Sequence, residues 1–199
     1  MLPLLFDLFA LLYAIQSVRT VMALVRHWRA FWDPLFTPQD ARLAQEVGFF
    51  LIIPIGVFLH EVGHYVAAQM VGARVLGFHY RLFWGYVSYE GYLTPLADWW
   101  IALSGNLVSV LFGLALLAAG YWGRRWRLPL RYTLLYAGQI ESAFALIAYP
   151  LFSFSGVFEG DWVTIYDFNT TPVVSTLTLL VHLGLVLTLL TWWREKRLV

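Results

Sequence analysis

Five long apolar segments constrain this chain more than any other feature of its sequence. Each is long enough for a helix to cross the hydrocarbon core of a bilayer, which is about 30 Å thick. Of the 199 residues, 60% are hydrophobic and 13% are charged, against about 45–50% and about 25% in average soluble domains. The sequence therefore predicts one domain, an all-α polytopic membrane protein with about five transmembrane helices. The segments are about 3–25, 47–71, 99–121, 129–152 and 173–193.

The first segment is the least regular, because Asp7, Gln16 and Arg19 interrupt it. It could cross the membrane or lie along the interface as an amphipathic helix, and we expect it to cross. The chain contains no cysteine, which excludes disulfides and thiolate metal sites. Its formal net charge of +1 gives no indication of a nucleic-acid partner, so the expected partners are the lipid bilayer and proteins within it.

The basic residues are distributed unequally between the two sides of the predicted membrane protein. With five spans, ten of them fall on one side, and only Arg74 and Arg81 fall on the other. The positive-inside rule makes the basic side cytoplasmic. We therefore expect an outside N-terminus, an inside C-terminus and an outside 153–172 connection, in a cell membrane of prokaryotic type. The ten are Arg26, Arg29, Arg42, Arg124, Arg125, Arg127, Arg131, Arg194, Lys196 and Arg197.

Residues 73–92, between the second and third segments, differ in character from the rest of the chain. They read ARVLGFHYRLFWGYVSYEGY, which is rich in β-branched and aromatic residues and roughly alternates in polarity. Gly77 and Gly85 interrupt the run. This pattern predicts a short β-hairpin associated with the membrane rather than another helix.

Residues 60–64 read His-Glu-Val-Gly-His inside the second apolar segment. On a helix, positions four apart share a face, so His60 and His64 can reach one metal ion. Glu61 is turned partly aside, where it can act as a general base toward water. Burying three ionisable side chains in a membrane helix costs several kcal/mol, so a functional role is the default expectation. The pattern predicts a Zn²⁺ site, although a histidine pair bonded to backbone or a metal site without catalysis would give the same sequence.

A zinc site needs a third protein ligand, and two acidic residues compete for that role. Asp161 follows the fourth segment in an acidic stretch that lacks Lys and Arg. Glu141 lies in the middle of the fourth segment, where it could be a ligand, a partner of a ligand or a proton carrier. We expect Asp161 to be the ligand and Glu141 to be the rival. His79, Glu90 and Asp98 are at plausible distances along the chain but are more typical of surface or interfacial residues.

Over about residues 47–121 the chain resembles the site-2 protease family of intramembrane zinc metallopeptidases. The resemblance rests on HEVGHYVAA at 60–68, the glycine-bearing strand region 74–91 and ALSGNLVSVLFG at 102–113. It implies a later Asp as third zinc ligand, and Tyr149-Pro150 followed by Gly160-Asp161 looks like the counterpart of the family's Asn-x-x-Pro and Asp-Gly pattern. No Asn stands three residues before Pro150, and Gly precedes Asp161 instead of following it.

The resemblance also implies a function, the hydrolysis of a peptide bond of a membrane protein in or near the bilayer. In that function Asn106 either contacts the substrate or joins two helices by hydrogen bonding. The family further implies that the strand region pairs with an unwound substrate. The alternative is a catalytically inactive, protease-like subunit or assembly factor of a larger membrane complex.

Overall fold

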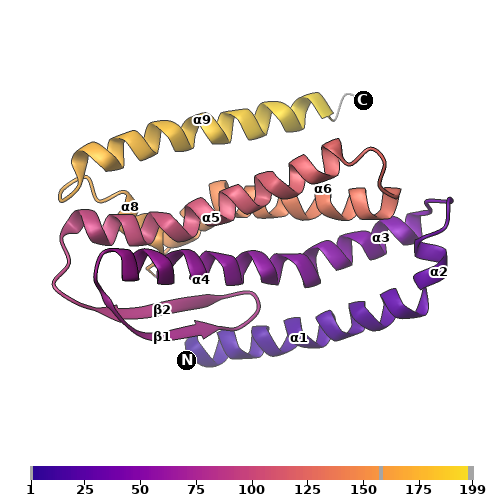
Figure 1. Ribbon diagram of the computed structural model, residues 1–199, viewed down its shortest axis with the longest axis horizontal. Helices are drawn as coiled ribbons and strands as arrows, with labels where there is room; N and C mark the ends of the chain where they lie inside the picture. Colours follow the sequence, from indigo (N-terminus) through magenta and orange to yellow (C-terminus); the bar gives the residue numbers. More distant parts are fainter. Residues whose placement is uncertain (1, 157–158, 197–199) are drawn as a thin grey trace.

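The computed structural model describes residues 2–156 and 159–196, and it forms a bundle of antiparallel helices with one small sheet at its edge (Figure 1). Five helical segments are long and apolar enough to cross a membrane, which confirms the predicted multi-pass helical fold. The elements are α1 (Leu2–Arg26), α2 (Trp28–Phe31), α3 (Pro38–Val47), the π-helix η1 (Gly48–Ile52), α4 (Ile53–Met70), β1 (Arg74–Tyr80), β2 (Gly85–Glu90), α5 (Pro95–Trp122), α6 (Leu128–Ala143), the π-helix η2 (Phe144–Ala148), α7 (Tyr149–Ser153), α8 (Asp161–Ile165) and α9 (Pro172–Lys196).

The candidate spans run alternately in opposite directions. The N-terminus, the two strands and α8 lie at the left in Figure 1, whereas α2, the α5–α6 connection and the C-terminal end lie at the right. α1 runs beside the other helices, as expected of a span. Of the basic residues expected on one side, Arg197 lies outside the described residues. The five candidate spans are Leu5–Arg26, Pro38–Met70, Pro95–Trp122, Leu128–Ser153 and Pro172–Arg194.

The second helix begins earlier than the apolar pattern predicted. Helical structure starts at Pro38, about nine residues before the expected start at 47. The Oγ1 of Thr37 accepts a hydrogen bond from the backbone N of Asp40 at 3.3 Å, and the Asp40 carboxylate accepts one from the backbone N of Thr37 at 2.8 Å. This capping box fixes the start of the helix. The predicted boundary was wrong because the first turns of this helix are polar, so hydropathy does not reveal them.

Pro54 interrupts the backbone ladder of the second span, and α1 compensates for it. Proline lacks an N–H, so it leaves the preceding π-helical turn η1 short of a backbone donor. The Oγ of Ser17 on α1 donates toward the carbonyl of Phe50 in η1 at 3.0 Å, and it shares its hydrogen with the carbonyl of Tyr13 on its own helix. Beside it, the hydroxyl of Tyr13 donates to the carbonyl of Phe49 in η1. Two hydroxyls of α1 therefore satisfy backbone acceptors of the neighbouring span within the membrane.

Pro150 creates a similar gap in the fourth span, and α9 fills it. Pro150 leaves the preceding π-helical turn η2 short of a backbone donor, and Nε2 of His182 donates to the carbonyl of Leu146 in that turn at 2.6 Å. The other ring nitrogen of His182 accepts a hydrogen bond from the hydroxyl of Tyr166, just after α8. This ring therefore joins three segments of the chain.

Glycines bring the central helices into backbone contact. A Cβ added to Gly63 on α4 would lie 2.8 Å from the carbonyl oxygen of Ser104 and 3.0 Å from the Cα of Gly105 on α5. A Cβ added to Gly138 on α6 would lie 2.9 Å from the carbonyl oxygen of Gly113 on α5. Small residues permit this close approach in membrane bundles. α5 is therefore the central helix against which α4 and α6 pack.

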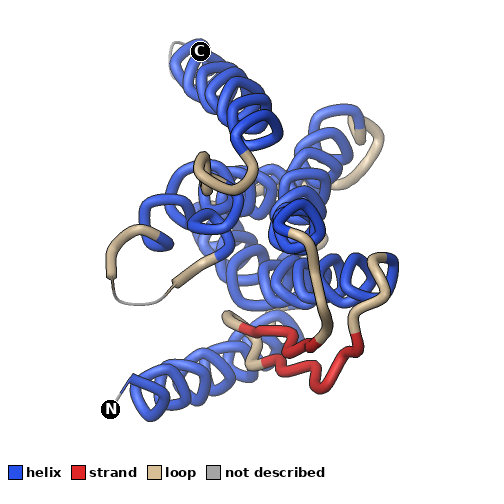
Figure 2. Tube along the Cα trace, turned by 90° about the vertical axis from the view of Figure 1, so that its left-hand side faces the viewer, coloured by secondary structure: helices blue, strands red, loops and turns tan. Residues whose placement is uncertain are grey.

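The expected hairpin is confirmed and packs against α4, with its tip against α1 (Figure 2). β1 and β2 pair antiparallel, with a register irregularity between Val75 and Gly77. At the tip, the ring of Phe83 stacks on Phe6 and Tyr13 of α1 at centroid distances of 6.4 and 6.0 Å. Leu82 adopts a positive φ of 64° in the turn. The hairpin is thus held between the first and second spans.

Candidate metal centre

Three side chains from distant parts of the chain converge at one point of the bundle. Nε2 of His60 lies 2.9 Å from Nε2 of His64, and Oδ2 of Asp161 lies 3.2 and 3.1 Å from these two nitrogens. Among the described residues, these three form the group of ligand atoms that could hold a metal ion. Separations of about 3 Å suit donor atoms that share one small cation with bonds of about 2.0–2.2 Å. The donor set and its spacing therefore fit zinc.

The helix α4 and the single turn α8 hold these donor atoms in place. His60 and His64 are one helical turn apart on α4, as the sequence predicted. Asp161 is the first residue of α8, a single turn that follows Gly160. Trp162 and Ile165 on α8 are 3% and 0% exposed, and they pack in one cluster with Ala102 of α5. Two buried apolar side chains thus hold the turn that presents the carboxylate.

The hydrogen bonds behind the two imidazoles determine which nitrogens face the cluster. Nδ1 of His64 lies 2.7 Å from the carbonyl oxygen of Ile101, which can only accept, so Nδ1 carries the proton. Nδ1 of His60 lies 3.1 Å from Oγ of Ser109. When the Ser109 hydroxyl accepts the Nδ1 hydrogen of His60, both Nε2 lone pairs point at the carboxylate of Asp161. Three acceptors that converge in this way repel one another unless a proton or a metal cation lies among them.

Asp161 is held by two further polar side chains. Its Oδ2 accepts a hydrogen bond from Nδ2 of Asn106 at 2.9 Å and another from the hydroxyl of Tyr149 at 3.1 Å. Burial alone would raise the pKa of the Asp161 carboxyl, but His64 and His60 hold that pKa well below its usual range. Asn106 also donates to the carbonyl of Ala102 at 3.0 Å. Asn106 therefore joins α5 to α8 by a hydrogen bond, as one of the two sequence-based interpretations expected, and this bond also orients the carboxylate.

Glu61 lies beside the cluster in a closed environment. It is 4% exposed, and its Oε2 has no hydrogen-bond partner among the described residues. A Cβ added to Gly85 on β2 would lie 2.7 Å from Cγ of Glu61, so the hairpin backbone covers this side chain. A buried carboxylate oxygen without a partner is costly, so the site has an open acceptor that a water or a substrate N–H can fill.

Glu141 lies outside the three-donor group. Its carboxylate occupies a space beside α4 that a side chain at Gly56 would fill, since an added Cβ would lie 2.7 Å from both of its oxygens. Its carboxyl interacts with the side chain of Ser109. The rival third ligand of the sequence analysis therefore lies behind His60, on the far side of Ser109.

The other candidates of the sequence analysis lie outside the cluster. His79 stacks on Tyr86 across the hairpin at a centroid distance of 4.4 Å, and Glu90 pairs with Arg74 at 3.2 Å. Asp98 lies in the first turn of α5. Sequence reasoning missed Ser109, whose only signal was its position in the polar face of the third span.

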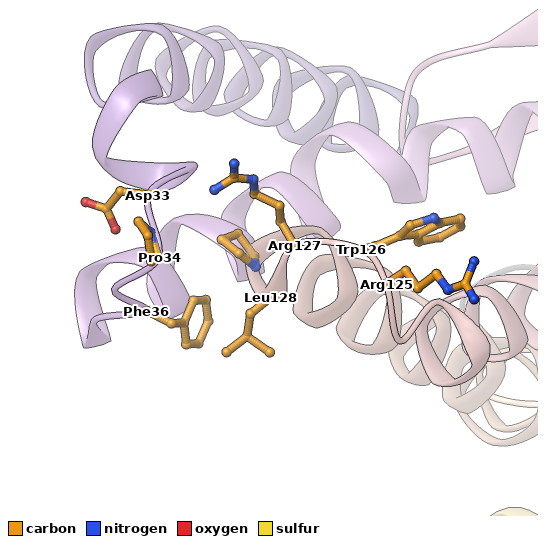
Figure 3. Close-up of a pocket in the computed structure, with 8 residues that line it drawn as sticks. Asp33, Pro34, Phe36, Arg125, Trp126, Arg127 and Leu128 are labelled. Carbon is orange, nitrogen blue, oxygen red and sulfur yellow. The ribbon is translucent and has the colours of Figure 1, made fainter.

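A separate hollow lies at the opposite end of the bundle, between the α2–α3 and α5–α6 connections (Figure 3). The lining residues shown there share no member with the histidine–aspartate cluster. They come from the α2–α3 connection and from the basic, aromatic α5–α6 connection with the start of α6, which suits an end that faces a headgroup region. The lining residues are Asp33, Pro34, Phe36, Arg125, Trp126, Arg127, Leu128 and Pro129.

The fold and the cluster together define a polytopic helical membrane protein with a buried site that could hold one metal ion. Comparison with protein-family models, with curated proteins and with solved structures gave no significant match.

Proposed function

We propose that this protein is a zinc metalloprotease of the membrane that hydrolyses a peptide bond of a membrane protein in or near the bilayer. The observation that carries the proposal is the convergence of His60, His64 and Asp161 beside the unpaired carboxylate oxygen of Glu61. The resemblance of residues 47–121 to site-2 proteases supports the same function. A site built only to stabilise the bundle would not need an unpartnered acid next to three converging acceptors.

Zinc would be held by His60, His64 and Asp161. When bound, it supplies Lewis acidity, which makes water a nucleophile near neutral pH and polarises a carbonyl. Ile101 and Ser109 fix the tautomers of the two histidines from behind.

Glu61 would carry the proton through the reaction. Its free oxygen accepts a proton from water as the water oxygen attacks the peptide carbonyl carbon. The carbon–nitrogen bond then breaks, and Glu61 passes the proton to the departing amine nitrogen. The backbone of Gly85 over Glu61 keeps bulk water away from this transfer.

We propose that the site lies nearer the non-cytoplasmic face. The cluster forms where α4 approaches the hairpin and α8, at the end of the bundle opposite to the basic α5–α6 connection (Figure 1). If the basic end is cytoplasmic, the N-terminus and α8 are outside and the C-terminus is inside.

The proposal is tested by replacing Glu61 with Gln, which keeps the shape of the side chain and removes the base. Loss of a general base lowers the rate by about 10²–10⁴-fold. Membranes that contain wild-type or E61Q protein are compared by mass spectrometry of newly formed N-termini, since this readout requires no known substrate. Glu46→Gln on α3, distant from the cluster along the helix, is the matched control.

The outcome separates an enzyme from a non-catalytic subunit. Cleavage products that depend on wild-type protein and vanish with E61Q support the protease. An E61Q protein that retains full biological activity eliminates the protease and favours an assembly factor within a larger membrane complex.

A further inference from the structure

Glu141 is a buried acid in the middle of a candidate span, and the proposed reaction does not use it. It is 4% exposed, and among the described residues no ion pair involves it. A carboxylate in such a place is expensive unless it serves a particular partner. Gly56 on α4 leaves the space that its carboxylate occupies, and Cβ of Glu141 would lie 3.4 Å from a Cβ added to Gly113 on α5. Its position is therefore built into the packing of α4, α5 and α6.

The polar contacts of Glu141 lead toward the metal cluster. Its carboxylate lies beside Gly56, one helical turn before His60, and interacts with the side chain of Ser109 on α5. Oγ of Ser109 in turn lies 3.1 Å from Nδ1 of His60. A serine hydroxyl has one hydrogen to donate and two lone pairs. An ionised carboxylate can only accept, so an ionised Glu141 takes the Ser109 hydrogen, and a lone pair of Ser109 remains for the N–H of His60. The chain of donors thus runs in one direction, from His60 to Ser109 to Glu141.

We propose that Ser109 and Glu141 form a hydrogen-bonded relay that positions His60 for metal binding. The relay holds the proton of His60 on Nδ1, which leaves the Nε2 lone pair free for the cation. His64 needs no such relay because the backbone carbonyl of Ile101 performs the same task. Ser109 and Glu141 are positioning residues, since neither belongs to the group of three donors. This inference rests on the proposed function, because it requires a metal at His60.

The relay predicts a specific pattern of metal affinities. Loss of a partner behind a metal-binding histidine typically weakens binding by about 10–100-fold. We expect Ser109→Ala to raise the zinc dissociation constant by this factor, and Ser109→Thr, which keeps the hydroxyl, to restore it. Glu141→Gln should raise the constant less, because an amide oxygen still accepts a hydrogen bond without the negative charge. The double variant S109A/E141Q should bind zinc no more weakly than S109A does, because both changes interrupt the same relay.

The full-length protein purified in detergent is titrated with zinc against a chromophoric chelator. Ser104→Ala is the matched control, because Ser104 is as buried as Ser109 on the same helix but donates to the carbonyl of Trp100. Ser142→Ala is a second control, beside Glu141. Both controls should bind zinc as the wild type does. The visible spectrum of the cobalt-loaded protein is the second readout, and it should change in S109A but not in S104A.

The outcomes distinguish the relay from the proposed function. Wild-type protein that binds zinc, with S109A, S109T and E141Q equal to it, overturns the relay and leaves the metal site in place. Wild-type protein that binds no zinc overturns both. Equal losses in S109A, S109T and S104A would also contradict the relay, because the hydroxyl would then not be the group that matters.

Discussion

At the scale of single residues, the two acids that competed in the sequence have different positions in the structure. Asp161 contacts both histidines, whereas Glu141 reaches only the serine behind one of them. We therefore expect Asp161→Ala to lose most of its bound zinc, because one of three donors is removed. Glu141→Ala should keep the metal at lower affinity. Zinc per protein, measured after dialysis against a weak chelator, checks this order, and the reverse order would make Glu141 the ligand.

How much of the site the sequence could predict depends on distance along the chain. His60, Glu61 and His64 were predictable because helical geometry alone brings four-apart residues together. Asp161 was a reasoned expectation, but its approach depends on the apolar anchor at Trp162, which has no local signature. Ser109 was not predictable, since its contact with His60 arises from the way in which α4 crosses α5.

At the scale of elements, the α4–α5 contact depends on glycine. In Gly63→Ala the new methyl would press on the backbone of Ser104 and Gly105, which cannot move aside as a flexible side chain would. Overpacking of this kind costs about 1–3 kcal/mol. Gly184→Ala on α9 is the control, because an added Cβ meets no atom within 4 Å there.

We expect G63A to unfold at a lower temperature than the wild type in detergent and to lose zinc affinity. G184A should be as stable as the wild type or more so, since Ala favours helix over Gly by about 1 kcal/mol. Equal melting temperatures for the two variants would contradict the close approach of α4 to α5 at Gly63.

The elements also show where hydropathy misleads. The five apolar segments were identified correctly because lipid-facing helices need uniform apolarity over about 20 residues. The start of the second helix was missed because the polar capping box of Thr37 and Asp40 decides it. The two prolines were visible in the sequence, but the hydroxyls and the ring that satisfy the freed carbonyls come from other spans, so they were not.

At the scale of the whole molecule, the absence of cysteine makes the orientation directly testable. A single cysteine at Asn169, which is exposed after α8, should react with a membrane-impermeant maleimide added to intact cells. A single cysteine at Arg125, which is exposed in the α5–α6 connection, should react only after the membrane is opened. The opposite labelling pattern would contradict the proposed membrane orientation and place the site near the cytoplasmic face.

The order of the candidate ligands along the chain has a consequence for when the metal site can form during synthesis and membrane insertion. His60 and His64 belong to the second span, but Asp161 is synthesised only after the fourth span. A nascent chain that has inserted two or three helices holds two of the three candidate ligands and has no complete metal centre. Under the proposed function, the chain therefore cannot gain hydrolytic activity before α8 has been synthesised and has reached α4.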